Sequence, residues 1–343
     1  MALLGELPIV QAPMAGGPST PELTAAVATA GGFGFLAGGY LTPDQLVATI
    51  ARTRARSDRP FGVNLFLPSE PSGRAPVRRY AERIRPEADR LGVALGDPRW
   101  DDDAVGDKLE VVASERVPMV SFTFGCPDPA SVERLHLADC RVAVTVTSPG
   151  EALAAEAVGA DLLVVQGTEA GGHQASFLGP GPNTRPLSAL LEELRGSTAL
   201  PLVASGGIMT GARGAEVMRL GAVGIQLGTV FLCADEAGTS DTYRRALLDG
   251  TYHDTVLTRA FSGRYGRGLA NEFAVTYLDD APEAYPEIHH LTRPLRAAAT
   301  RAGDPSTPNL WAGTGWRAVT PGPASVIVAR IASELASALG PAG

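Results

Sequence analysis

Short runs of apolar, β-rich residues recur along the chain, and each is followed by a loop and then by a helix-like stretch. Apolar residues are nearly continuous within the runs, which is the pattern of parallel strands covered on both faces. The runs are Pro8–Pro13, Phe33–Ala37, Phe61–Phe66, Pro118–Phe122, Arg141–Thr145, Asp161–Gln166, Leu200–Ser205 and Val223–Leu227. The pattern predicts eight parallel strands.

Helix-start signals lie between these runs. Thr20, Thr42 and Ser148 are each followed at once by a proline, with an acidic residue shortly after it. A hydroxyl at the N-cap and a proline in the first turn are typical of helix starts. A further helix is predicted from Thr210 to Leu220 and ends at a glycine. This alternation predicts an α/β fold, a TIM (β/α)8 barrel, because the alternative of an open doubly wound sheet lacks a first-strand GxGxxG.

Two regions depart from the alternation. Residues 68–116 are too long for one crossover and carry many charges, so they predict a helical excursion from the barrel. Residues 258–320 are rich in Arg, Gly and Pro and predict a smaller cap or lid domain over one barrel mouth. The expected division is therefore a barrel of residues 1–257 and 321–343 with a cap of residues 258–320. The last helix should pack back on the barrel.

Composition narrows the class of protein. The 343 residues are 45% hydrophobic and 19% charged, which suffices for a large core and excludes global disorder. A net charge of −8 without a basic cluster argues against a nucleic-acid partner. No run is long enough for a membrane helix, and the N-terminus lacks a secretion signal, so we expect a cytoplasmic protein without a membrane partner. Three widely spaced cysteines predict neither disulfides nor a metal site.

Glycine pairs follow several predicted strands, where TIM barrels place their chemistry. The loops after the seventh and eighth strands commonly hold a phosphate, which makes Gly206, Gly207, Gly228 and Thr229 candidate ligands. The alternative is that each glycine pair only permits a sharp turn. A phosphate at this mouth, with an elongated glycine-lined pocket, suits a mononucleotide such as FMN.

Two amides and one imidazole stand out in these loops. Asn64 and Gln166 end the third and sixth predicted strands, and their amides could serve the flavin ring or instead satisfy loop backbone. His173 could accept a proton as a neutral imidazole, or it could fill a hydrogen-bonding position. Glu169 either orients that imidazole or holds the loop through backbone N–H groups, and we favour the loop role.

Other candidates allow two interpretations. The segment Arg259–Arg267 either closes over an anion or forms a surface cluster of ion pairs. His289 and His290 are expected on the solvated surface or at the pocket rim, because adjacent histidines lack the spacing of a metal site. Aromatic residues near strand ends line the pocket or simply pack: Tyr40, Phe66, Phe122, Phe124 and Tyr285.

Together the motifs resemble the class I nitronate monooxygenases, formerly called 2-nitropropane dioxygenases. The resemblance runs in order through PIVQAPMAGG, GGFGFLAGGY, FGVNLFLP, VSFTFGCP, QGTEAGGH, LPLVASGGI, LGAVGIQLGTVFL, RAFSGR and WAGTGW. It spans almost the whole chain, and the combination is far more specific than any one motif.

The resemblance implies an FMN-dependent TIM barrel with a smaller second domain, and His173 as general base. It places FMN contacts at Asn64, Gln166, Gly171, Gly207 and Gln226 to Thr229 (Gln226, Leu227, Gly228 and Thr229), with Met14 bordering the flavin. The implied reaction uses O2 to turn alkyl nitronates into carbonyl compounds and nitrite through an anionic flavin semiquinone, with neutral nitroalkanes as further candidate substrates.

The chain departs from the expected family pattern in its YPEIHH segment, where lysine is also absent. A carboxylate-bearing substrate would therefore need an Arg or Tyr partner. The nearest alternative function is an NAD(P)H-dependent FMN reductase of the enoyl or quinone type. A non-redox sugar-phosphate barrel and a catalytically inactive ligand-binding barrel are more distant alternatives.

Overall fold

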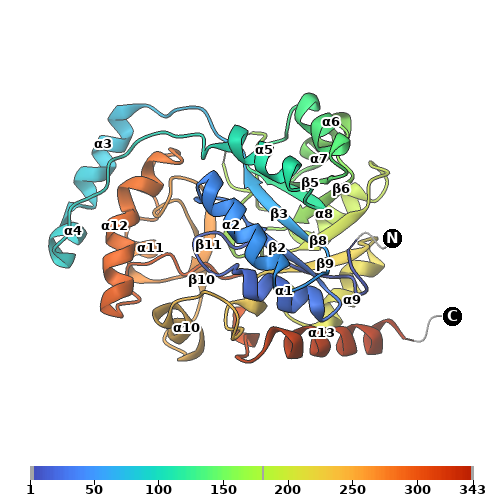
Figure 1. Ribbon diagram of the computed structural model, residues 1–343. Helices are drawn as coiled ribbons and strands as arrows, with labels where there is room; N and C mark the ends of the chain where they lie inside the picture. Colours follow the sequence, from blue (N-terminus) through green and yellow to red (C-terminus); the bar gives the residue numbers. More distant parts are fainter. Residues whose placement is uncertain (1–3, 180, 341–343) are drawn as a thin grey trace.

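A computed structural model describes residues 4–179 and 181–340, and within them parallel strands close into a barrel in the order β1-β2-β3-β4-β5-β6-β8-β9 (Figure 1). The barrel strands are β1 Ile9–Gln11, β2 Phe33–Ala37, β3 Phe61–Phe66, β4 Met119–Thr123, β5 Arg141–Val146, β6 Leu162–Gln166, β8 Leu202–Ser205 and β9 Gly224–Leu227. Each predicted apolar run overlaps one of these strands, with β4 and β5 extending one residue beyond it, and the predicted TIM barrel is confirmed.

The strands close because both of their faces are apolar. Alternate strand positions point into the barrel, where they form one buried cluster. It contains the strand residues Val10, Phe33, Phe35, Met119, Ala143, Leu162, Val164 and Val203, together with Leu4, which precedes β1. The intervening positions, such as Val63, Val120 and Val144, pack outward against the surrounding helices in the largest core cluster. The barrel is thus a packed core, and only the ends of its strands are free to meet a ligand.

Helices cover the barrel from outside. They are α1 Pro21–Thr29, α2 Pro43–Arg54, α5 Val105–Ser114, α6 Pro129–Leu137, α7 Pro149–Ala157, α8 Leu187–Leu194, α9 Gly211–Arg219 and α13 Ala324–Leu339. The predicted caps are present, since Thr20, Thr42 and Ser148 each accept a backbone N–H with their side chain. Helix α13 packs against α9 and α1, as its apolar stripe predicted.

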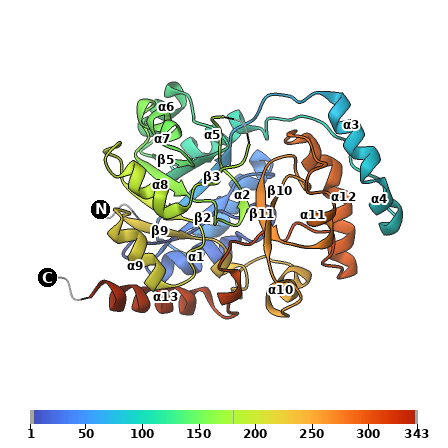
Figure 2. The ribbon, with the colours of Figure 1, turned by 180° about the vertical axis from the view of Figure 1, so that it is seen from behind.

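A second layer lies beside one mouth of the barrel (Figure 2). It contains α3 Arg74–Arg83, α4 Arg85–Leu91, α10 Asp241–Leu248, α11 Glu272–Thr276 and α12 Glu287–Ala302, and a sheet ordered β10-β11-β7. Helices α3 and α4 share a hydrophobic cluster with α11 and α12. The third helix of the predicted excursion, α5, instead packs on the barrel against α2 and β3. The described residues also form two short 3-10 helices, η1 Thr229–Phe231 and η2 Trp316–Ala318.

One short strand joins the two layers. β7 is only Gly172–His173, and it pairs antiparallel with β11 (Gly266–Leu269), which in turn pairs with β10 (Thr255–Thr258). His173 lies opposite Gly266 in this ladder. The loop after barrel strand β6 is therefore held by a sheet of the second layer, and His173 is fixed where barrel and second layer meet.

Candidate active site

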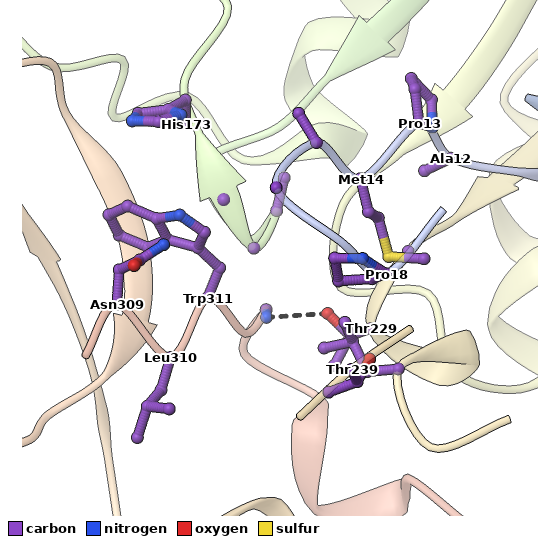
Figure 3. A pocket seen from close by; sticks show the side chains of 18 of the residues that line it. Ala12, Pro13, Met14, Pro18, His173, Thr229, Thr239, Asn309, Leu310 and Trp311 are labelled. Carbon is purple, nitrogen blue, oxygen red and sulfur yellow. Dashed lines mark hydrogen bonds between the residues drawn. The ribbon is translucent and has the colours of Figure 1, made fainter. Parts of the chain in front are cut away.

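A cavity of about 610 Å³ lies between the carboxyl ends of the barrel strands and the second layer (Figure 3). It brings together candidates from the ends of five barrel strands and the loops that follow them. Those that line it are Met14, Asn64, Gln166, Gly171, His173, Gly206, Gly207, Gln226, Gly228 and Thr229. The proposed phosphate ligands and the proposed base thus face one space.

Leu227 is the exception among the candidates, because its side chain is buried in the hydrophobic core instead of facing the cavity. Successive side chains of a strand point to opposite faces, so Gln226 reaches the cavity while Leu227 points outward to the helices. Only its backbone acts near the site, where its carbonyl accepts the Ala12 N–H at 2.8 Å. The FMN contact expected at Leu227 therefore stays a prediction, and only its backbone is placed to make it.

His173 sits in an aromatic enclosure. Its ring lies 5.1 Å from Trp311, 5.6 Å from Phe124 and 5.9 Å from Tyr285, measured between ring centroids. Burial, together with the charges of Arg264 and Arg296, lowers the pKa of His173 to about 3. The imidazole is therefore neutral at ordinary pH and keeps a lone pair for a proton.

The hydroxyl of Ser262 determines which nitrogen keeps that lone pair. It lies 2.7 Å from Nε2 of His173 and donates its single hydrogen to the Arg264 carbonyl at 3.2 Å. With its hydrogen on the Arg264 carbonyl, Ser262 accepts a hydrogen bond from Nε2–H, and in that tautomer the free lone pair belongs to Nδ1. Nδ1 has no hydrogen-bonding partner among the residues that the structure describes.

The glycine loops form a close-fitting wall with free donors. Gly206 and Gly207 have φ of 125° and 66°, so they adopt backbone that side chains rarely adopt. A Cβ on Gly171 would lie 2.5 Å from the Gly313 nitrogen, so backbone passes against backbone there. Across residues 4–179 and 181–340, the amides of Gly206, Gly207 and Gly228 donate to no other residue. Free N–H groups beside a cavity fit a phosphate.

The side-chain amides of Gln166 and Asn64 make different hydrogen bonds. Gln166 donates to the His173 carbonyl at 3.1 Å and accepts the Ala175 N–H at 2.8 Å, so its side chain holds the loop backbone. Asn64 uses only its Nδ2, which donates to Ser121 and Thr123. Its Oδ1 receives no donor from the described residues and lies at the cavity wall. Gln166 positions the loop that bears His173, whereas Asn64 keeps an acceptor for a ligand.

Several other expectations are settled by the contacts. Glu169 accepts the Leu187 N–H through both carboxylate oxygens, so it holds the loop as we favoured. Arg264 is half-buried over the Phe124 ring, donates to the Ser176 carbonyl and is not among the residues that line the cavity. Phe122 is fully buried in the core and does not line the pocket.

His289 is buried in the cavity wall, which corrects the expectation of a solvated or rim position. Its ring stacks on Tyr40 with centroids 4.2 Å apart. Tyr40 is held at φ 67° by its N–H bond to Asp103, and Asp103 pairs with buried Lys108 at 2.8 Å. His290 instead pairs with Asp101 at 2.8 Å. His289 reaches the cavity by packing against Tyr40, which is far from it in the sequence, so the residues around His289 do not predict its burial.

Sequence reasoning did not assign roles to Ser262 and Trp311. Both stand in motifs noted for their resemblance, RAFSGR and WAGTGW, but each comes to His173 only through tertiary packing. Thr229 was assigned as a phosphate ligand, and the structure adds that its hydroxyl accepts the Gly313 N–H at 3.0 Å. The segment around Trp311 therefore closes over the glycine loops.

The family model for nitronate monooxygenase matches residues 1–334. The chain belongs to the nitronate monooxygenase family. A probable nitronate monooxygenase of Staphylococcus aureus strain JH9 is 35% identical over 340 residues, which cover 96% of this chain and 94% of the relative. The corresponding protein of strain MSSA476 is similar to the same extent.

Solved structures agree with this family. The crystal structure of nitroalkane oxidase from Streptomyces ansochromogenes is 47% identical, with a TM-score of 0.95 over 98% of this chain and 97% of that one. FabK from Thermotoga maritima is 28% identical, with a TM-score of 0.76 over 96% and 93% of the two chains. The chain is thus an oxidoreductase of a flavin-dependent family, and its family supports oxidation of nitroalkanes or nitronates.

Two features are absent from the described residues. None of their helices is long and apolar enough to cross a membrane. Their His, Cys, Asp and Glu side chains form no group of three that could hold a metal ion.

Proposed function

We propose that this nitronate monooxygenase family member binds FMN and uses O2 to oxidise alkyl nitronates and neutral nitroalkanes to carbonyl compounds and nitrite. The observation that carries the proposal is the position of His173. A neutral imidazole faces the same cavity as a set of glycine amides that have no partner among the described residues. That pairing suits proton abstraction beside a phosphate-bearing cofactor.

The residues present fit FMN. The free amides of Gly206, Gly207 and Gly228 would receive the phosphate, with Thr229 at the start of η1. The free Oδ1 of Asn64 would accept an N–H of the flavin ring, and Gly171, Gln226 and Met14 would border it. FMN, when bound, supplies the electron acceptor between the nitronate and O2.

The first step assigned to the protein's own residues is removal of a proton from the substrate. A neutral nitroalkane must lose its α proton before it can be oxidised, and Nδ1 of His173 would accept that proton. Ser262 would hold the imidazole in the tautomer that leaves Nδ1 free. A nitronate already lacks the proton and bypasses this step. Trp311, Phe124 and Tyr285 flank the imidazole and hold it in place at the cavity wall.

The test is the absorbance spectrum of the purified protein, followed by anaerobic titration with an alkyl nitronate. We expect a flavin spectrum, FMN as the released cofactor, and bleaching by the nitronate. A colourless protein that takes up no FMN would overturn the proposal. Rapid bleaching by NADH or NADPH, without bleaching by nitronate, would instead establish the FMN reductase alternative.

A further inference from the structure

Tyr40 has a backbone conformation that residues other than glycine rarely adopt. It follows two glycines in the loop after β2, and its φ is 67°. Such a left-handed conformation persists only where surrounding contacts enforce it. One such contact is a hydrogen bond of 3.0 Å from the Tyr40 N–H to the carboxylate of Asp103, which is 63 positions away in the chain. A distant side chain therefore holds Tyr40 in place.

Asp103 is itself anchored by a buried ion pair. Its second carboxylate oxygen lies 2.8 Å from Nζ of Lys108, whose side chain is only 1% exposed. Lys108 belongs to α5, which packs on the barrel against α2 and β3. A buried ammonium group without a counter-ion is strongly destabilising, so the ion pair keeps Asp103 beside the Tyr40 loop. Through Asp103 and α5, the barrel thus fixes the position of Tyr40.

The ring of Tyr40 is part of a continuous aromatic surface in the cavity. It stacks on His289 with centroids 4.2 Å apart and meets Phe66 edge-on at 5.5 Å, and all three residues line the cavity. Phe66 in turn lies 4.6 Å from Phe124, whose ring is 5.6 Å from His173. The surface therefore connects Tyr40 with the imidazole proposed as the base.

The Tyr40 hydroxyl has a hydrogen available for a ligand. The Tyr285 hydroxyl donates to it at 3.3 Å, so the hydrogen of Tyr40 points elsewhere. No residue in the described part of the chain accepts that hydrogen. A flat ring with a free donor at a cavity wall suits a planar group whose oxygens accept hydrogen bonds, such as a nitronate.

We propose that Asp103 and Lys108 are positioning residues for substrate binding, and that they act by holding Tyr40 against His289. The inference rests on the proposed function and adds residues outside the cavity that determine substrate affinity. Neither Asp103 nor Lys108 lines the cavity, so an effect of either on the substrate must pass through Tyr40. The base and the glycine loops are not involved.

A matched pair of variants isolates the hydrogen bond to Tyr40. D103N/K108M keeps an oxygen for the Tyr40 N–H, D103A/K108M does not, and neither leaves a buried charge. We expect KM for propyl-2-nitronate to be about tenfold higher in D103A/K108M, the effect of one lost hydrogen bond, with kcat nearly equal. A nitronate is used because it needs no base. Equal KM values in the two variants would overturn the inference.

A double-mutant cycle tests whether the effect passes through Tyr40. Y40G removes the ring, and glycine adopts φ 67° without help from Asp103. Y40G should raise KM about tenfold by itself, and D103A/K108M should add nothing in that background. Additive effects would show that Asp103 acts elsewhere, and the inference would be wrong. The Kd of FMN should be unchanged throughout, since weaker FMN binding would assign Tyr40 to the cofactor and also overturn the inference.

A binding measurement separates the inference from the proposed function. Isobutyrate resembles propyl-2-nitronate in size and charge but cannot be oxidised, and its affinity by calorimetry should be about tenfold lower in D103A/K108M than in D103N/K108M. If nitronates are oxidised but neither KM nor this affinity differs, the inference is wrong and the proposed function stands. If the affinity differs but no nitronate is oxidised, the proposed function is wrong and the positioning role holds for another ligand. If neither result is obtained, both are wrong.

Discussion

The cavity has two walls, one from the barrel and one from the second layer, and they present different chemical groups to a ligand. The barrel wall offers backbone N–H groups of glycine loops, whose positions follow from strand register. The opposite wall offers the rings around His173 and the long side chains of α12. Backbone positions suit a constant cofactor, whereas side chains can vary without disturbing the barrel. We therefore expect the barrel wall to determine cofactor binding and the second layer to determine catalysis on particular substrates.

The largest effect is expected where the walls meet, at His173. H173N should reduce kcat/KM for neutral nitroalkanes by about 10²–10⁴-fold, because it removes the proton acceptor. Activity on preformed nitronate should be much less affected, since that substrate has no α proton to lose. Steady-state kinetics on both substrate forms measure the difference. Equal losses on both forms would reject His173 as the base.

The barrel wall is tested at Gly171. In G171A the new Cβ would lie 2.5 Å from the Gly313 nitrogen and 2.6 Å from the Ala312 carbonyl carbon, so the backbone must move. We expect FMN affinity to fall roughly 100-fold, a large but ordinary cost for such a clash. Fluorescence titration of FMN measures it. A methyl group added at Gly106 would have nothing within 4 Å, so G106A is the matched control and should bind FMN normally.

Protonation of His173 should weaken the fold in acid. The pKa of His173 is about 3 in the folded chain against an ordinary 6.5, so only the unfolded state takes up a proton below pH 6.5. The free energy of unfolding should fall by about 2 kcal/mol from this group between pH 6.5 and 5, and should be unaffected by it above pH 6.5. Denaturant unfolding at several pH values measures the slope. An unchanged slope in H173N would assign the effect to other groups.

The smallest effect is expected at Ser262, which acts through His173. S262A should lower activity on neutral nitroalkanes about tenfold, because the imidazole loses the partner that selects its tautomer. S262T retains a hydroxyl and should restore most of the loss. Activity on nitronate should be the same in all three proteins. A loss shared by both substrate forms, or no rescue by threonine, would show that Ser262 only supports the structure.

The barrel could be predicted from the sequence because its strands and helices are determined by residues next to one another in the chain. Continuous apolar runs become strands, and caps such as Thr42 start helices, whatever the rest of the chain does. The glycine loops were located for the same reason, since they follow directly from strand ends. The orientation of the Leu227 side chain follows from the alternation of side chains along a strand, which the motif match alone does not give.

The second layer could not be predicted in the same way. His289 was expected at the surface or rim because nothing near it in the sequence reveals the stacking against Tyr40. Ser262 and Trp311 reach His173 across long separations in the chain, and β7 is too short to give a periodic signal. The precise boundaries of barrel and cap stay a prediction.

The burial of Lys108 has a practical consequence. This residue is the chain's sole lysine, its side chain is only 1% exposed, and its ammonium group is held against Asp103. An acylating reagent meets that amine only when α5 and the Tyr40 loop separate. The rate at which the reagent modifies Lys108 would therefore report how often α5 and the Tyr40 loop separate. A bound ligand that stacks near Tyr40 should slow this modification.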